Sequence, residues 1–321
     1  MKEEGREGAA FLDEVRKKRG IEAVVASFRN LAEKREEQAV ADLNDRRLSF
    51  PTVYALRKEI EQFGFIEVMH WRTRTALEWL REDQWTLSSD VQSVHPSLKW
   101  IVTTGATETI DAGYLKKIDE AAALLTMVFR DHSLLPTVAD AIFYRCRNDL
   151  PYHYLVTAFL EAKNPHSLTL IADKLRSADS KEAACARKML GFVPGINKQD
   201  EKDDTKPFTA FLRWMEENGP YLRYKGETFD TFSHPTPYVL VYAAKYGGHF
   251  VSVEDGTPIV KLTKQERRTW ERFEVLPLEQ QKRLAGLSFR KRRENDDEWV
   301  RWMQLSMKKQ LKAAQGREND D

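Results

Sequence analysis

The chain has 321 residues, of which 31% are charged, and its 51 Lys and Arg nearly balance its 50 Asp and Glu to give a net charge of +1. Such a balance steers the protein toward no class of charged partner. The 15 Gly and 12 Pro are fewer than average composition gives, which indicates a helix-rich, water-facing protein.

Three features bear on the cellular compartment. The N-terminal MKEEGREGAA has no apolar stretch of the kind that a signal peptide needs. The longest apolar runs, such as residues 121–129, fall far short of the ~20 residues of a membrane span. With only two cysteines, Cys146 and Cys185, we expect buried thiols and no disulfide framework. We therefore expect a cytoplasmic protein with no transmembrane segment.

Residues 1–90 predict an N-terminal helical region. Apolar residues recur at helical spacing over 21–43, and Pro51 opens a second amphipathic stretch that reaches Gly64. A third helix is predicted over 70–81. The polar, Ser-rich segment 86–97 carries Pro96 and predicts a loop and a domain boundary.

Residues 39–68 contain a Thr-Val-Tyr helix start and a closing Gly-hydrophobic-Ile. In these features the segment resembles the recognition helix of a winged helix-turn-helix, a DNA-binding family. The resemblance implies that four side chains face a DNA groove: Thr52, Tyr54, Arg57 and Lys58. It also implies that Val53, Leu56 and Ile60 pack inward. The alternative is an amphipathic helix of an all-α domain.

Residues 98–194 predict helical repeats. When the sequence is shifted by 29 residues, Pro136 falls on Pro165 and apolar positions coincide at helical spacing. The coinciding pairs are Ala139 with Leu168, Ile142 with Ile171, Phe143 with Ala172, Cys146 with Leu175, Val156 with Cys185 and Leu160 with Met189.

A two-helix unit at a short period is typical of an α-solenoid. Residues 114–192 resemble the short bacterial HEAT-like repeats, antiparallel helix pairs that stack side by side. The resemblance accounts for the small side chains of residues 183–186, because these let a neighbouring helix approach closely. Only two copies are visible, so the helix at 114–130 must contribute to a stable stack. A plain helical bundle is the alternative.

The run 195–207 is charged and predicts a linker. The mixed C-terminal region 208–321 follows, with short β-like stretches, a hairpin signal at Asp255-Gly256 and a capping box from Thr263 to Glu266. It ends in a basic amphipathic helix predicted over 296–313. The expected fold class is thus mainly α, α-solenoid-like in the middle, with a small α+β C-terminal region.

No spacing typical of catalysis or metal binding occurs. The seven histidines form no HxxxH or HExxH, there is no CxxC, and the segment 103–109 lacks the ending of a phosphate-binding loop. We expect no catalytic residue, no metal and no cofactor, and therefore no enzyme. A site assembled from distant residues stays open as a third interpretation.

Residues 261–312 hold 15 Lys or Arg against 8 Asp or Glu. They include the block Arg290, Lys291, Arg292 and Arg293, with Trp270, Trp299 and Trp302 nearby. Aromatic rings among cations can stack on bases while the cations pair with phosphates. The alternatives are a solvated basic helix and a helix lying in the plane of a membrane.

These patterns favour a non-enzymatic cytoplasmic scaffold or adaptor that presents a helical-repeat surface to a protein partner. The alternative is a nucleic-acid-binding or regulatory protein that uses residues 39–68 and the C-terminal basic helix.

Overall fold

The structure is a computed structural model, and it describes residues 10–81, 91–197 and 206–316. Within these ranges the chain is mainly helical and carries one two-stranded sheet. It divides into two compact units, residues 1–162 and residues 163–321. This division falls inside the segment 98–194, and most of the predicted linker 195–207 lies outside the described residues. The mainly α fold class with a small C-terminal sheet is confirmed.

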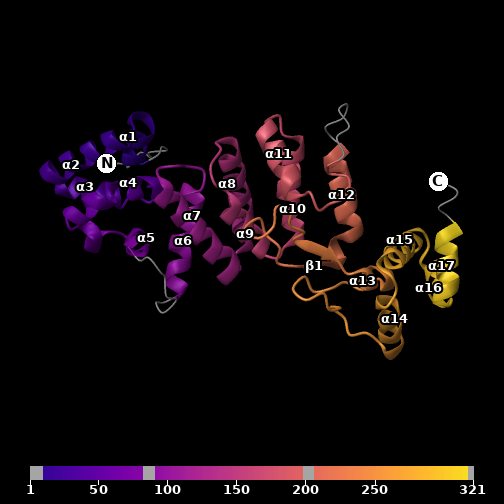
Figure 1. Cartoon of the computed structure of the whole chain (residues 1–321). Coiled ribbons are helices and arrows are strands. Elements are labelled where there is room, and N and C mark those ends of the chain that lie inside the picture. The colour runs from indigo at the N-terminus through magenta and orange to yellow at the C-terminus, as the bar shows by residue number, and fades with distance from the viewer. Residues whose placement is uncertain (1–9, 82–90, 198–205, 317–321) are drawn as a thin grey trace, which may run out of the picture. The chain divides into compact units, whose positions relative to one another are not determined.

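The first unit is helical throughout its described part (Figure 1). Its elements are α1 (Phe11–Arg19), α2 (Ile21–Lys34), α3 (Glu36–Leu43), α4 (Phe50–Gln62), η1 (Phe65–Val68), α5 (Trp71–Arg81), α6 (Val91–Gly105), α7 (Ala112–Ala123), the π-helical turn η2 (Leu124–Val128), η3 (His132–Leu134), α8 (Leu135–Arg147) and α9 (His153–Glu161). Helices adjacent in the chain pack together, as α1 does with α2 and α8 with α9. Helix α4 is enclosed by contacts with α1, α2, α5 and α6.

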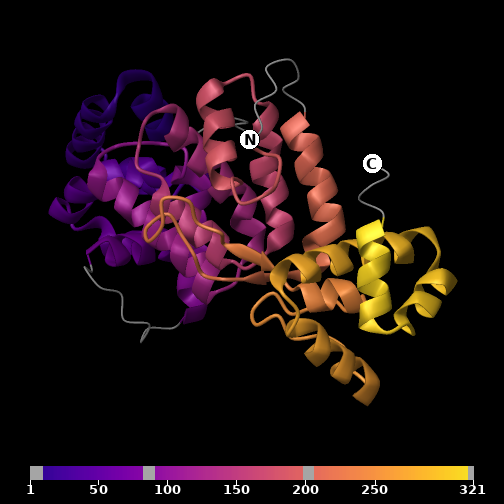
Figure 2. The same cartoon turned by 45° about the vertical axis from the view of Figure 1, so that its right-hand side comes forward.

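The second unit combines helices with the small sheet. Its elements are η4 (Pro165–Ser167), α10 (Leu168–Ala172), η5 (Asp173–Arg176), α11 (Ser180–Met189), α12 (Lys206–Asn218), η6 (Gly219–Tyr221), β1 (Leu222–Tyr224), β2 (Tyr238–Leu240), α13 (Tyr242–Gly247), α14 (Lys264–Glu274), α15 (Leu278–Glu294), α16 (Asp296–Met303) and α17 (Met307–Gly316). Helix α15 packs against α13, α16 and α17, and Figure 2 shows α16 and α17 in yellow beside it.

Two helix pairs stand where the 29-residue offset places them. Helix α8 packs on α9 in the first unit, and α10 packs on α11 in the second. All the matched apolar positions are buried: Ala139, Ile142, Phe143, Cys146, Val156 and Leu160, and their counterparts Leu168, Ile171, Ala172, Leu175, Cys185 and Met189. The Asp179 side chain caps α11 by accepting hydrogen bonds from the backbone N–H of Lys181 and Glu182. The apolar pattern therefore marks the packed faces of both pairs correctly.

The sheet pairs β1 with β2 in antiparallel register, with Leu222 opposite Leu240. The hairpin signal at Asp255-Gly256 is confirmed as a tight turn, because the backbone N–H of Ser252 donates to the carbonyl of Thr257 at 2.8 Å. Gly256 has a φ of +77°, a conformation that favours glycine. An isolated antiparallel bridge joins Val251 to Pro258 beyond the turn.

Two predicted elements are wrong. The helix expected over 296–313 is divided into α16 and α17, because the chain turns at 304–306 and α17 packs back on α15. Of the loop expected over 86–97, residues 86–90 lie outside the described residues, and the rest is wrong because the chain is helical from Val91 onward. Val94, Leu98, Ile101 and Val102 form a buried helical stripe in α6, and the helix continues through Pro96, which lies inside it.

Two further observations concern the cysteines and membranes. Cys146 and Cys185 are both buried, as expected, but neither is a free thiol in the structure, so the expectation of thiols is wrong. Proximity in space decides the state of a cysteine, and sequence spacing does not reveal it. Among the described residues, no helix has both the length and the apolar character needed to cross a membrane.

Candidate functional site

Helix α4 is the predicted recognition helix, and its sequence explains where it begins. Ser49 precedes it in extended conformation, and Pro51 lies in the first turn, where proline needs no hydrogen bond. Val53, Leu56 and Ile60 are completely buried, as expected for an inward face.

The two polar residues at the start of α4 do not face a groove. Thr52 is completely buried, and Tyr54 is nearly so. The Tyr54 hydroxyl donates to Asp111 Oδ1 at 2.8 Å, and burial together with this bond raises the pKa of Tyr54 to about 12. The expectation that Thr52 and Tyr54 face DNA is therefore wrong, because α4 is covered by other helices on this side as well.

The two cations of α4 differ in how free they are. The Arg57 guanidinium lies 3.9 Å from the centroid of the Tyr54 ring and donates to the Tyr54 carbonyl at 2.6 Å. Lys58 is exposed. Arg57 is therefore held against Tyr54, and Lys58 is the one exposed residue among the four predicted contact residues.

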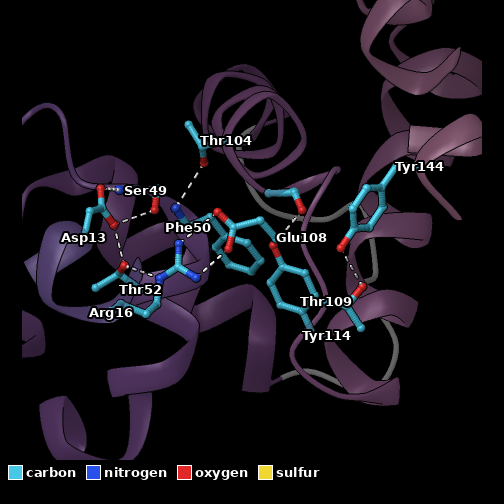
Figure 3. A network of polar contacts seen from close by, with 11 residues as sticks. Asp13, Arg16, Ser49, Phe50, Thr52, Thr104, Glu108, Thr109, Tyr114 and Tyr144 are labelled. Carbon is cyan, nitrogen blue, oxygen red and sulfur yellow. Dashed lines mark hydrogen bonds and ion pairs between the residues drawn. The ribbon is translucent and has the colours of Figure 1, made fainter. Parts of the chain in front are cut away.

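A network of buried polar side chains surrounds the start of α4 (Figure 3). Asp13 of α1 accepts hydrogen bonds from the Ser49 backbone N–H at 2.9 Å and from the Ser49 hydroxyl at 2.6 Å. Asp13 also accepts a hydrogen bond from the Thr52 hydroxyl. One carboxylate therefore serves three donors at the N-terminus of α4, where free backbone N–H groups favour an acceptor.

Arg16 extends the network to the end of α6. Its Nε donates to Thr52 Oγ1 at 2.8 Å, and its two terminal nitrogens bind both carboxylate oxygens of Glu108. A bidentate pair of this kind fixes the relative orientation of the two side chains and is stronger than a single hydrogen bond. On the same side, Thr104 accepts from the Phe50 backbone N–H at 3.0 Å. The side chains join α1, α4 and α6 and are occupied with one another, so we assign them a structural role.

The basic block on α15 is largely occupied within its own unit. Lys291 pairs with Glu298 at 2.5 Å, and Arg293 pairs with Glu216 at 3.1 Å. Arg292 donates to the Tyr221 hydroxyl and lies 5.5 Å from the Trp299 ring centroid. Arg290 is exposed and makes no ion pair within the described residues. The block is therefore mostly a set of internal contacts.

The three tryptophans near this block have different surroundings. Trp302 is buried in the core of the second unit. Trp270 and Trp299 are half-buried and line a cavity of about 330 Å³ between α13, α14 and α16. A volume of this size matches small-molecule sites, which combine apolar walls with a few polar groups.

Helices α13, α14 and α16 supply different parts of the cavity. Tyr246 comes from α13, Trp270 and Glu266 from α14, and Trp299 and Met303 from α16. The predicted capping box fixes the start of α14, since Thr263 Oγ1 accepts from the Glu266 N–H at 3.2 Å and Glu266 Oε2 accepts from the Thr263 N–H at 2.7 Å. That exchange also fixes the Glu266 side chain at the cavity wall.

His249 and Glu266 are the titratable pair of this cavity, with His249 Nε2 3.8 Å from Glu266 Oε1. Burial lowers the pKa of His249, and the attraction of Glu266 does not offset it. Hydrogen bonds from Thr263 lower the pKa of Glu266. At neutral pH the pair is therefore a neutral imidazole beside a carboxylate.

The cavity was not predicted from the sequence, although three of its parts were noticed: the capping box, Trp270 and Trp299. Their convergence depends on how α16 folds back, which no local pattern encodes. Within the described residues, no group of three or more His, Cys, Asp or Glu side chains is placed to hold a metal ion. Comparison of the chain with protein-family models, with curated proteins and with solved structures finds no match.

Proposed function

We propose that the chain is a non-enzymatic cytoplasmic scaffold or adaptor that binds a protein partner through its helical-repeat region. In this proposal α8–α9 and α10–α11 are copies of a HEAT-like unit. The burial of all matched apolar positions in both pairs supports it. Stacked helix pairs present extended surfaces to partners.

The observation that carries the proposal is a set of exposed apolar side chains in this region. Met127 is 46% exposed and Val128 is 48% exposed, both on η2, and Tyr154 on α9 is 68% exposed. Elements η2 and α9 pack against each other in the first unit. Contiguous exposed apolar surface is typical of protein-binding sites, and the packing of η2 on α9 places these three side chains on neighbouring elements. In addition, η2 is a π-helical turn, a feature that occurs often at functional sites.

The proposal is tested with a variant that removes these exposed apolar side chains and preserves the fold. The variant carries Met127→Ser, Val128→Ser and Tyr154→Ser, and the matched control carries Phe11→Ser, which is 51% exposed in the same unit. Wild-type and control protein, cross-linked in lysate of the source cells, should retain the same partner, and the triple variant should lose it. Retention of that partner by the triple variant, or no retained partner with wild type, would contradict the proposal.

The nucleic-acid alternative rests on fewer residues than the sequence indicates. Thr52 and Tyr54 are buried, and Lys291, Arg292 and Arg293 are held by acceptors in the chain. The exposed members of its two predicted contact sets are Lys58, Arg290 and Arg293, and Arg293 is paired with Glu216. For this reason we place the scaffold function first.

A further inference from the structure

The cavity between α13, α14 and α16 has no part in the proposed scaffold function. Its lining combines aromatic side chains with one acidic residue. We propose that this cavity binds an alkylammonium group, of which a quaternary trimethylammonium is the best representative. Its aromatic walls, its single negative charge and the absence of any cation from its lining lead to this ligand class.

The walls are electron-rich and held in place. The Tyr246 ring stacks on Phe273 with centroids 4.5 Å apart, and the Trp299 indole N–H donates to Ser288 Oγ at 2.8 Å. Trp270 and the Met303 thioether complete these walls. Aromatic faces attract ammonium groups, most strongly when the site is partly desolvated. Trp299 already attracts one cation of the chain, the guanidinium of Arg292.

The charge of the lining gives the sign of the ligand. Glu266 is its only acidic residue, and the lining contains no Lys or Arg. The other lining side chain that titrates near neutral pH is His249, whose pKa is lowered by burial and by the nearby Arg292. Glu266 therefore carries the one full charge of the lining at neutral pH. An anionic ligand would meet this carboxylate directly, and a neutral ligand would leave its charge uncompensated. A cation with apolar methyl groups satisfies both the charge and the rings.

The cation proposal also accounts for the position of Glu266 at the N-terminus of α14. A free helix N-terminus favours anions. Here the Thr263 hydroxyl and the Glu266 carboxylate already bind the backbone N–H groups of each other's residues. The capping box thereby satisfies the Glu266 N–H of the first turn, and the full charge that Glu266 adds to the lining is negative.

The first experiment is isothermal titration calorimetry on the full chain with choline chloride, at constant ionic strength and neutral pH. The control ligand is 3,3-dimethylbutan-1-ol, which has the shape of choline but carries no charge. We expect saturable choline binding with Kd below about 10 mM and affinity for the alcohol at least about tenfold weaker. Equal affinity for the two ligands, or no saturable binding of choline, would overturn the proposal.

Variants connect the binding to this cavity. Glu266→Gln keeps an oxygen that can accept the Thr263 N–H, so the helix start is preserved while the charge is lost. We expect it to weaken choline binding about tenfold. Glu271→Gln on the same helix removes an exposed carboxylate outside the lining and should leave the affinity unchanged. Trp299→Phe should bind more weakly than wild type, and Trp299→Leu more weakly still. Unchanged affinity in Glu266→Gln and Trp299→Leu would place any binding elsewhere.

A trimethylammonium group can come from a free small molecule or from a methylated lysine of a protein. The source is distinguished by titrating the Nα-acetyl amide of trimethyllysine alongside choline. Tighter binding of the lysine derivative than of choline indicates a protein source, and the reverse indicates a free metabolite. Because the triple variant on η2 and α9 leaves this cavity intact, choline binding by that variant separates this proposal from the scaffold function.

Discussion

At the scale of single residues, the Thr52 hydroxyl is the junction of the polar network at the start of α4. It accepts a hydrogen bond from Arg16 and donates one to Asp13, so both charged groups depend on it. The side chain is completely buried, where water cannot replace a lost partner. A threonine at a helix start is compatible with a DNA contact, and only the helices around α4 determine that it points inward.

We expect Thr52→Val, which keeps the shape of the side chain, to lower the free energy of unfolding by about 1–3 kcal/mol, because Arg16 and Asp13 each lose a buried partner. Chemical denaturation monitored by circular dichroism measures this change. Thr103→Val is the control, since Thr103 is exposed and bonds only to carbonyls of its own helix. Its effect should stay within about 0.5 kcal/mol. Equal effects of the two substitutions would contradict the structural role of the network.

Asp131 predicts a pH dependence of stability. Burial alone would raise its pKa, but hydrogen bonds from Ser133 and Lys99 outweigh burial and hold the pKa at about 2. The folded pKa thus lies below the unfolded value of about 3.9, so the stabilisation is present above pH 4 and is lost as the pH falls toward 2. Wild type should therefore be more stable than Asp131→Asn at pH 6, and the difference should shrink by pH 3. A difference that is constant between these pH values would contradict this assignment.

At the scale of elements, the helix pattern was predictable where apolar residues form one continuous stripe. Ile142 and Ile171 mark the buried faces of α8 and α10, and Thr263 with Glu266 marks the start of α14. The break at 304–306 was not predictable, because Met303 and Met307 continue the helical spacing across it. After the break Gln310 makes a hydrogen bond with Tyr246, which lies 64 residues away in the sequence, and local spacing does not reveal such a contact.

Gln310 fastens α17 to the second unit. It is almost fully buried, its Oε1 accepts from the Tyr246 hydroxyl at 2.6 Å, and its Nε2 donates to the Trp302 carbonyl at 2.9 Å. We expect Gln310→Leu to cost about 1–3 kcal/mol of stability and to speed amide hydrogen exchange in 307–314 more than in α15. Lys309→Leu changes the adjacent exposed residue and should leave the exchange rates as they are. Uniform exchange across α15 and α17 in Gln310→Leu would show that Gln310 does not fasten α17.

The candidate cavity shows where prediction from sequence ends. Trp270 and Trp299 were noticed for their cationic neighbours, which suggested stacking on nucleic-acid bases. In the structure Arg292 and Lys291 bind acceptors of their own unit, and the two indoles line a cavity with Glu266. Residue types in a window are the same for both arrangements, so only the three-dimensional partners distinguish them.

At the scale of the whole molecule, the nearly balanced charges bear on the nucleic-acid alternative. A chain with 51 basic and 50 acidic residues has no long-range field that draws phosphates toward it. Its predicted contact residues are mostly buried or paired, so few cations are left to release counterions. We expect no salt-dependent binding to labelled duplex or single-stranded DNA in fluorescence anisotropy. The nucleic-acid alternative would be established if binding weakened steeply with salt and was lost in the double variant Lys58→Glu/Arg290→Glu.

The scaffold function itself is tested most directly by site-specific photo-cross-linking. A benzophenone amino acid is placed at Tyr154 in the proposed binding surface, and in a second protein at Phe11, which is exposed in the same unit. After irradiation in the source cells, we expect a discrete cross-linked adduct with one protein partner from position 154 and none from position 11. Adducts from neither position, or the same adducts from both, would contradict a partner-binding surface on η2 and α9.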